Sequence, residues 1–124
     1  MANPPRLAKK DLSQANLAQT DLTGADLHES NLRGATLTES KLDGADLRKA
    51  DLTGANLGGA TLRDATAAEA NLEGADLRDV DLTGTDLRRA RLSGAKLRDS
   101  QLADAERAGA SLDEQPATPA DSKT

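Results

Sequence analysis

The chain has 124 residues, which is enough for one domain at most. It contains no Cys, Phe, Trp or Tyr, and this excludes a disulfide framework, a thiol nucleophile and a cysteine metal site. Its formal net charge of -5 favours solubility and argues against a general nucleic-acid binder, which would carry a basic face.

Residues 1–9 precede the regular part of the chain and are expected to form an N-terminal arm or a cap. Pro4 and Pro5 stand in this segment, and no apolar run follows them. The start of the sequence therefore predicts neither a signal peptide nor a membrane span. The lack of cysteine agrees with a cytoplasmic location, which we expect for this chain.

Residues 10–113 repeat with a period of five. All twenty leucines of the chain lie on numbers that leave a remainder of two on division by five. Between Leu12 and Leu102 this register is interrupted only by Ala67. From Ala15 to Ala110 the residue two positions before this register is small, never larger than Val80, and the residue just before the leucine is most often Asp or Asn. Such self-similarity means that each pentapeptide is one structural unit.

A period of five fits neither an α-helix nor a flat strand. A helix advances about 100° per residue, so leucines five apart would scatter around the cylinder without forming a stripe. A strand would send alternate leucines to opposite faces, because its side chains alternate with a period of two. A coil that turns a corner every five residues places each Leu and each small residue inside. Stacked coils then pair as short parallel strands about 4.8 Å apart.

Glycines mark corners of this predicted coil, because Gly tolerates the positive φ that a tight turn needs. They fill alternate corners, so we expect two alternating turn types. Seven of them share one column, on numbers ending in four: Gly24, Gly34, Gly44, Gly54, Gly74, Gly84 and Gly94.

Two positions break the leucine register. Ala67 stays in frame with its neighbours, so we expect a tolerated small cavity or a local inward shift there. Arg107 cannot lie unpaired in an apolar shaft, so the regular coil should end near residue 105, with Leu112 folding back as a cap. No capping helix is evident in the sequence. Residues 114–124 are polar and contain proline, which predicts a disordered C-terminal tail.

The segment Ala50-Asp51-Leu52-Thr53-Gly54-Ala55-Asn56-Leu57 resembles the pentapeptide repeat family. The resemblance covers residues 10–113, and its repetition makes it highly specific. It implies an all-β fold, a right-handed quadrilateral parallel β-helix with four pentapeptides per coil and about five coils. It also suggests a bacterial source and agrees with an end-to-end homodimer, because solenoid ends expose apolar cross-section and some relatives dimerise through one end.

Side chains suited to catalysis or metal binding are few. The single histidine, His28, is expected to be an exposed, solvated residue, and without a second His or any Cys we predict no metal site. The Ser and Thr residues have no accompanying base, so no nucleophilic dyad is predicted. The glycines recur as corners rather than as a phosphate-binding loop. We therefore predict no catalytic residues, no cofactor-binding residues and no enzyme activity.

Stacking the outward residues twenty apart predicts columns of opposite charge that neutralise one another, as cross-strand pairing favours. Asp26 and Asp46 stack as like charges, with Arg48 nearby. The predicted opposite pairs are Asp43 with Arg63 and Asp21 with Lys41, together with the alternating column Glu29, Lys49, Glu69 and Arg89.

The same stacking leaves two interpretations of four cations. They could form a small basic patch on one face, or they could belong to a solvated face interspersed with Glu69 and Asp86, and we prefer the second interpretation. The cations are Arg48, Lys49, Arg88 and Arg89.

Two function classes remain open. We prefer a noncatalytic structural or protein-interaction module with an unknown protein partner and no direct nucleic-acid or membrane binding. The alternative is a DNA-mimicking protein that binds or protects DNA gyrase, as the resemblance implies for some relatives. A mimic would need contiguous acidic faces, and those relatives use much Phe in the central position, a residue that this chain lacks.

Overall fold

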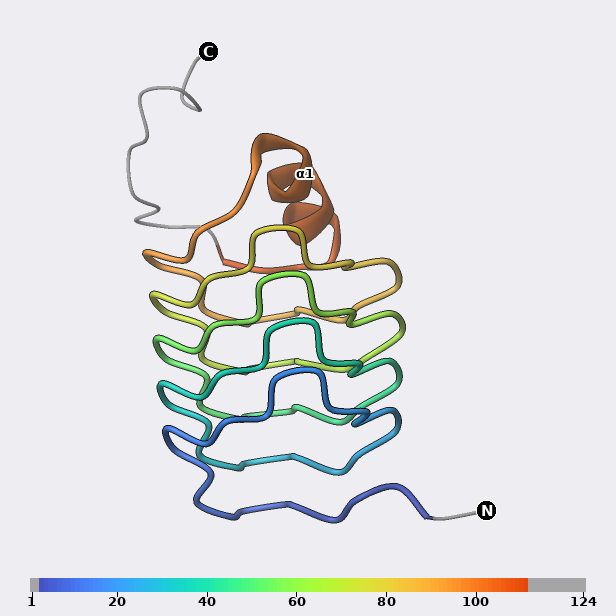
Figure 1. The fold of residues 1–124 in the computed structure, drawn as a ribbon. Coiled ribbons are helices and arrows are strands. Elements are labelled where there is room, and N and C mark those ends of the chain that lie inside the picture. Colours follow the sequence, from blue (N-terminus) through green and yellow to red (C-terminus); the bar gives the residue numbers. More distant parts are fainter. Residues whose placement is uncertain (1–2, 112–124) are drawn as a thin grey trace.

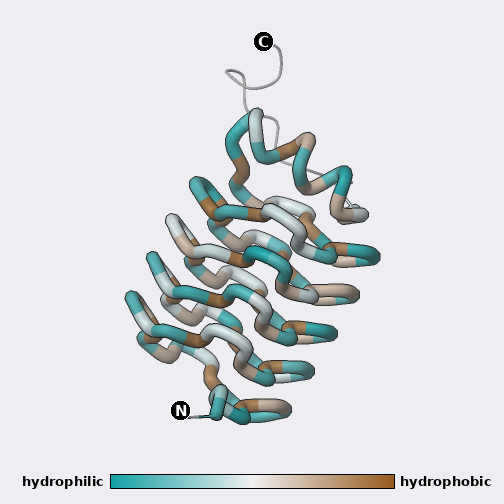
Figure 2. Tube along the Cα trace, turned by 90° about the vertical axis from the view of Figure 1, so that its right-hand side faces the viewer, coloured by the Kyte–Doolittle hydropathy of each residue, from teal (hydrophilic) through white to brown (hydrophobic). Residues whose placement is uncertain are grey.

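A computed structural model describes residues 3–111, and these residues form a stack of coils with one short helix at the C-terminal end (Figure 1). The residue before each leucine forms a parallel β-bridge with the residue twenty positions later, from Arg6 with Asp26 to Asp76 with Lys96. Twenty residues per coil and five per side give four sides, which confirms the predicted quadrilateral parallel β-helix. Figure 2 shows the coils as stacked bands in which polar and apolar residues follow one another.

The four sides are named here by their first units. Side 1 begins with residues 5–9, side 2 with 10–14, side 3 with 15–19 and side 4 with 20–24, and each recurs every twenty residues.

Backbone hydrogen bonds join each coil to the next along the rod axis. The leucine N–H donates to the following coil, as Leu32 N does to Asp51 O at 2.7 Å. The residue before a leucine donates to the preceding coil, as Asp51 N does to Ser30 O at 3.0 Å. Each side therefore behaves as a narrow parallel sheet that runs the length of the rod.

The inward positions form one apolar core, as predicted. Leu27, Leu32 and Leu37 are fully buried, and the small residues of the alternate inward column, such as Ala35, are buried with them. Ala67 is also buried, at 1% exposure, so it keeps the inward position that its register predicts. Since burial of one Leu is worth about 1.5–3 kcal/mol, the leucine columns are the main source of stability.

All corners are alike, so the prediction of two alternating turn types is wrong. Apart from the corner at Thr20, the corners close by a backbone hydrogen bond to the carbonyl three positions earlier, as Ala35 N donates to Leu32 O at 3.0 Å. The residue before the small residue has positive φ whether it is Gly, as at Gly34 (66°), or not, as at Glu39 (56°). Positive φ at the third turn residue is the pattern of a type II turn. The turn demands one conformation, and longer side chains adopt it as well as glycine.

Part of the segment predicted as an N-terminal arm or cap, residues 1–9, pairs with the following coil. Leu7 N donates to Asp26 O at 2.7 Å, and Asp26 N donates to Pro5 O at 2.9 Å. Residues 5–9 therefore already form side 1 of the first coil. Proline is tolerated at position 5 because this residue contributes only its carbonyl oxygen to the pairing. In later units the N–H at this position closes the preceding corner, and Pro5 follows no such corner.

The predictions that the coil continues to about residue 105 and that no helix caps it are both wrong. Helix α1 spans Asp99–Arg107 and lies on the C-terminal end of the stack (Figure 1). It buries Gln101 and Ala105 over the shaft. Asp99 in its first turn and Arg107 in its last match the helix dipole. The β pairing resumes at Ser111, which forms a bridge with Arg91.

The side-chain amide of Gln101 replaces part of the backbone hydrogen bonding between coils that α1 interrupts. Its Nε2 donates to Leu77 O at 2.6 Å and to Val80 O at 3.1 Å. Its Oε1 accepts from Arg98 N at 2.9 Å and from Asp79 N at 3.3 Å. Of these groups, Asp79 N and Val80 O are the ones that a further coil would otherwise pair, as Arg78 O and Asp81 N pair their equivalents Gly59 N and Ala60 O.

The cap predicted at Leu112 and the tail predicted for residues 114–124 lie outside the described residues. Within residues 3–111, no helix is long and apolar enough to cross a membrane.

Candidate functional site

The residue before each leucine stabilises its own corner. Wherever this residue is Asp or Asn within the described coils, its Oδ1 accepts a hydrogen bond from the backbone N–H two positions later, as Asp21 does from Thr23 N at 3.0 Å and Asn31 does from Arg33 N at 3.1 Å. This local contact explains the Asp and Asn preference of the column. Sequence reasoning missed it, although the constant Asp-Leu-X spacing carries the signal.

Three units extend this contact to a two-point ion pair. In each Asp-Leu-Arg unit the guanidinium donates two hydrogen bonds to the carboxylate of the same unit. Arg78 Nε and Nη2, for example, lie 3.0 and 2.8 Å from the two oxygens of Asp76. Asp46 with Arg48 and Asp86 with Arg88 form the same arrangement.

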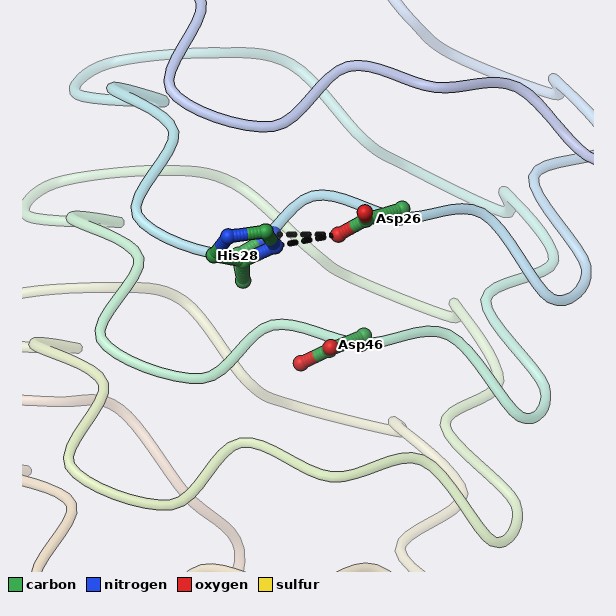
Figure 3. A group of neighbouring side chains, drawn as sticks. All are labelled: Asp26, His28 and Asp46. Atoms are coloured by element: carbon green, nitrogen blue, oxygen red, sulfur yellow. Dashed lines mark hydrogen bonds and ion pairs between the residues drawn. The ribbon is translucent and has the colours of Figure 1, made fainter.

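One group of side chains on side 1 has the composition of a metal site. Asp26, His28 and Asp46 each offer a ligand atom, and these atoms lie within 4.8 Å of one another (Figure 3). His28 is partly exposed rather than fully solvated as predicted, since its Nδ1 lies 2.5 Å from Asp26 Oδ1. Two carboxylates and one imidazole suit a first-row divalent cation in principle.

Arg48 competes with any cation for this cluster. Its Nε and Nη2 lie 2.8 and 2.6 Å from the two oxygens of Asp46. The pKa of the Asp46 carboxyl is lowered, chiefly by the hydrogen bond from Arg48, and the pKa of Asp26 is lowered, chiefly by the hydrogen bond from His28. Both carboxylates are therefore committed to protein donors. The predicted absence of metal, catalytic and cofactor-binding residues stays a prediction.

Other ion pairs join neighbouring coils. Arg63 Nε lies 2.5 Å from Asp81 Oδ2, in the next coil, while Asp43 accepts from the Arg63 backbone N–H at 3.1 Å. The predicted alternating column is paired at Glu69 with Arg89 (4.0 Å). Further cross-coil pairs are Arg33 with Asp51, Arg91 with Glu73, Arg98 with Asp79 and Lys9 with Glu29.

Three of the four cations, Arg48, Arg88 and Arg89, lie beside carboxylates, which favours the preferred interpretation of a face of mixed charge. Arg48 and Arg88 are neutralised by the aspartates of their own units, and Arg89 lies near Glu69. The outward positions of sides 1, 2 and 4 thus carry charges of both signs, largely paired with each other.

Side 3 differs over its first three coils. The outward residues before and after the leucine carry no charge, and the corner residue Glu39 accepts a hydrogen bond from Gln19 Nε2 at 3.0 Å. Asn16 pairs with Thr36 and Thr36 pairs with Asn56 along one ladder. We name this surface the uncharged patch, and it consists of Asn16, Ala18, Thr36, Thr38, Asn56 and Gly58.

A four-sided parallel β-helix of pentapeptides, with a filled core and corners of one type, defines the class of protein. The sequence matches the family described as pentapeptide repeats, in eight copies over residues 11–48, 30–66, 45–84, 68–102 and 81–114. The chain belongs to the pentapeptide repeat family, and the predicted right-handed quadrilateral β-helix agrees with the fold of its relatives.

Solved structures of the family are similar to this chain. The pentapeptide repeat protein Rfr23 from the cyanobacterium Cyanothece is 38% identical with a TM-score of 0.76, over 78% of this chain and 67% of that one. A pentapeptide repeat protein from the thylakoid lumen of Arabidopsis thaliana is 30% identical with a TM-score of 0.57, over 92% of this chain and 84% of that one. The cyanobacterial relative is consistent with the predicted bacterial source.

One solved structure of lower sequence identity gives no basis for assigning a function to this chain. The plasmid-mediated fluoroquinolone resistance protein QnrB1 is 17% identical with a TM-score of 0.40, over 90% of this chain and 62% of that one. Comparison with curated proteins finds no match.

Proposed function

We propose that this chain is a noncatalytic module that binds another protein through the uncharged patch. The observation that carries the proposal is the contrast between side 3 and the other sides. Covering a surface ion pair removes water from both charges, and the centres of interfaces are depleted in charged residues. A partner can cover Asn16, Thr36 and Asn56 without that cost. The small groups at Ala18 and Gly58 let a flat partner surface approach the backbone closely.

The experiment compares two single substitutions of the same kind. Thr38→Arg adds a cation to the uncharged patch, where Thr38 is half-buried, and Thr23→Arg adds one to side 4, where Thr23 is exposed. Tagged wild-type chain and both variants are used to capture partners from a lysate of the native cell. We expect a protein that is retained by wild type and by Thr23→Arg and is lost with Thr38→Arg. Equal retention by all three chains, or recovery of the bait alone, contradicts the proposal.

The duplex-mimic alternative finds less support in the surface. Its acidic side chains are interleaved with arginines, as at Asp76 with Arg78 and Asp81 with Arg63, rather than gathered on one face. A gyrase supercoiling assay separates the two functions. The interaction-module proposal expects no effect of added chain at high molar excess, and protection or inhibition of gyrase would favour the mimic.

The N-terminal end is a second contact surface in this proposal, with a second copy of the chain as its occupant. Leu7, Leu12 and Leu17 are partly exposed there, whereas Leu22 is 3% exposed and α1 covers the opposite end. Light scattering should detect a dimer that is lost in Leu12→Lys and kept in Ser13→Lys. A wild-type chain that is monomeric at all concentrations contradicts this contact. A cytoplasmic location stays a prediction.

A further inference from the structure

One stretch of the last complete coil lacks the partner that every lower coil has. On side 4, Leu62 N donates to Asp81 O at 2.9 Å, and Asp64 N donates to Thr83 O at 2.9 Å. The equivalent donors one coil higher are Leu82 N and Gly84 N. Their acceptors would come from residues 101 and 103, but both of these residues belong to α1.

The neighbouring donors on this end are satisfied in other ways. Asp79 N donates to the side chain of Gln101, Leu87 N donates to Ala108 O at 2.8 Å, and Arg89 N donates to Gly109 O at 3.2 Å. Among residues 3–111, Leu82 N and Gly84 N find no acceptor. Two donors that lie two residues apart on one strand of side 4 are therefore left without an acceptor beside α1.

A pocket lies at this edge, with the coil on one side and α1 on the other. Its volume is about 310 Å³, many times the roughly 30 Å³ that one water occupies in the liquid. The Thr85 hydroxyl is already committed to Leu62 O at 2.7 Å, so the coil side offers mainly its backbone N–H groups. The lining residues are Leu82, Thr83, Gly84, Thr85, Asp104, Arg107 and Ala108.

The charges at the pocket disfavour an anion as its ligand. Arg107 Nη1 lies 3.0 Å from Asp104 Oδ1, so its positive charge is already neutralised. The pocket also lies beside the last turn of α1, where the helix dipole is negative. Neutral acceptors fit better than a phosphate or a carboxylate.

We propose that this pocket binds a short extended peptide, which adds one parallel rung to side 4. Two peptide carbonyls would accept from Leu82 N and Gly84 N, with the spacing that Asp81 O and Thr83 O show toward the coil below. Addition of a strand to an open sheet edge is a known mode of peptide recognition. In the lower coils the residue between these two carbonyls is an inward leucine. Here α1 already covers the shaft with Ala105, so the middle residue of the ligand is Gly or Ala.

Amide exchange tests the premise before any ligand is added. Leu82 and Gly84 should exchange their amide protons faster than Leu62 and Asp64, their equivalents one coil lower. The probe is then the peptide acetyl-Thr-Gly-Thr-amide at millimolar concentration, followed by amide chemical shifts. We expect saturable shifts centred on residues 82–84 and slower exchange at Leu82 and Gly84.

A matched pair of variants locates the binding. Ala108→Leu, just after α1, places a larger side chain in the pocket and should abolish the shifts, whereas Ala103→Leu, exposed on α1 and outside the pocket, should keep them. Circular dichroism of both variants checks the fold. The proposal is overturned if Leu82 and Gly84 exchange as slowly as the control amides, if both variants bind alike, or if inorganic phosphate shifts these amides and the peptide does not.

Discussion

Each corner of the rod requires one residue in the left-handed conformation, and this requirement falls on very different side chains. Glycine meets it at Gly44 and Gly54, and long charged residues meet it at Lys49 and Glu69. For a residue with a Cβ this conformation costs roughly 1–2 kcal/mol. The cost is tolerated because the hydrogen bonds between coils hold the corner residue in place.

Replacement of one corner glycine should therefore destabilise the rod. Gly54 has φ of +69° and no atom within 4 Å of an added Cβ, so Gly54→Ala tests conformation without a clash. We expect a loss of about 1 kcal/mol in urea unfolding. Gly58 is a control because its φ is not positive, and an added Cβ would lie 3.3 Å from Asn56 Oδ1. Gly58→Ala should be neutral or slightly stabilising, and equal losses for both variants would contradict the conformational explanation.

Ala67 offers a second test at this scale. It is buried in the column of Leu47 and Leu87, so Ala67→Leu should increase the free energy of unfolding by about 1–2 kcal/mol. Ala65→Leu enlarges a buried residue of the small-residue column and should destabilise by about 1–3 kcal/mol through overpacking. Thermal unfolding of the two variants measures the contrast. A lower melting temperature for Ala67→Leu would show that the leucine register has no room at this point.

At the scale of elements, α1 decides how the rod ends. A helix cannot continue the β pairing of side 4, so its junction with the last coil depends on side-chain hydrogen bonds. Gln101 supplies four of them from a residue that is 7% exposed. An amide is suited to this task because it carries both donors and acceptors, as the missing backbone does.

Loss of the Gln101 amide should loosen the C-terminal end first. In Gln101→Ala the Val80 carbonyl and the Asp79 N–H lose their partners, and we expect a cost of about 2–3 kcal/mol. Hydrogen exchange should accelerate at residues 77–98 more than in the first coils. Gln14→Ala serves as the control because Gln14 is exposed and its side-chain hydrogen bond, to Arg33 O, is 3.5 Å long. Uniform acceleration along the rod would argue against a local capping role.

The repeat could be predicted from the sequence, and the cap could not. A period of five fixes which residues point inward, so the core, the corners and the stacking interval follow from it. Leu97 and Leu102 keep this register through the start of α1, and Ala105 keeps the small-residue column. The sequence pattern therefore does not reveal where the coil gives way to the helix. Arg107 marked the end of the apolar column without indicating a helix.

The surface could be predicted in part. Stacking at twenty residues anticipated the neutralised columns, but it assigned Arg63 to Asp43, whereas the side chain of Arg63 reaches Asp81. The contact of His28 with Asp26 was missed because it forms within one unit rather than between coils. Long side chains choose among several carboxylates at similar distance, and a register does not specify that choice.

At the scale of the whole molecule, hydrogen-bonded aspartates make stability depend on pH. The pKa of Asp81 is lowered from 3.8 to about 2 by the Thr83 hydroxyl, the Arg63 guanidinium and the Thr83 N–H. The pKa is lowered in the same direction at Asp11, Asp21, Asp26, Asp46, Asp51, Asp76, Asp79 and Asp86. A folded-state pKa below the unfolded value means that the ionised form favours the fold.

This stabilisation is complete above about pH 4 and is lost as the pH falls through the folded-state values. The urea midpoint should therefore decrease between about pH 4 and pH 2, and the midpoint of Asp81→Asn should decrease less than that of wild type over this interval. Thr83→Val, which removes the hydroxyl donor, should reduce the decrease in the same way. A midpoint that does not change with pH in wild type would exclude this linkage.

The interval of twenty residues also sets how the two proposed binding surfaces face each other. Removal of one whole turn, such as residues 61–80, would shorten the rod and leave α1 above side 4, because every later residue keeps its column. Removal of a single pentapeptide, such as residues 61–65, would keep every leucine inward but rotate all later residues by one side. The peptide pocket would then move by a quarter circuit around the axis relative to the uncharged patch. The number of pentapeptides between the two surfaces thus sets which of four orientations they take relative to each other.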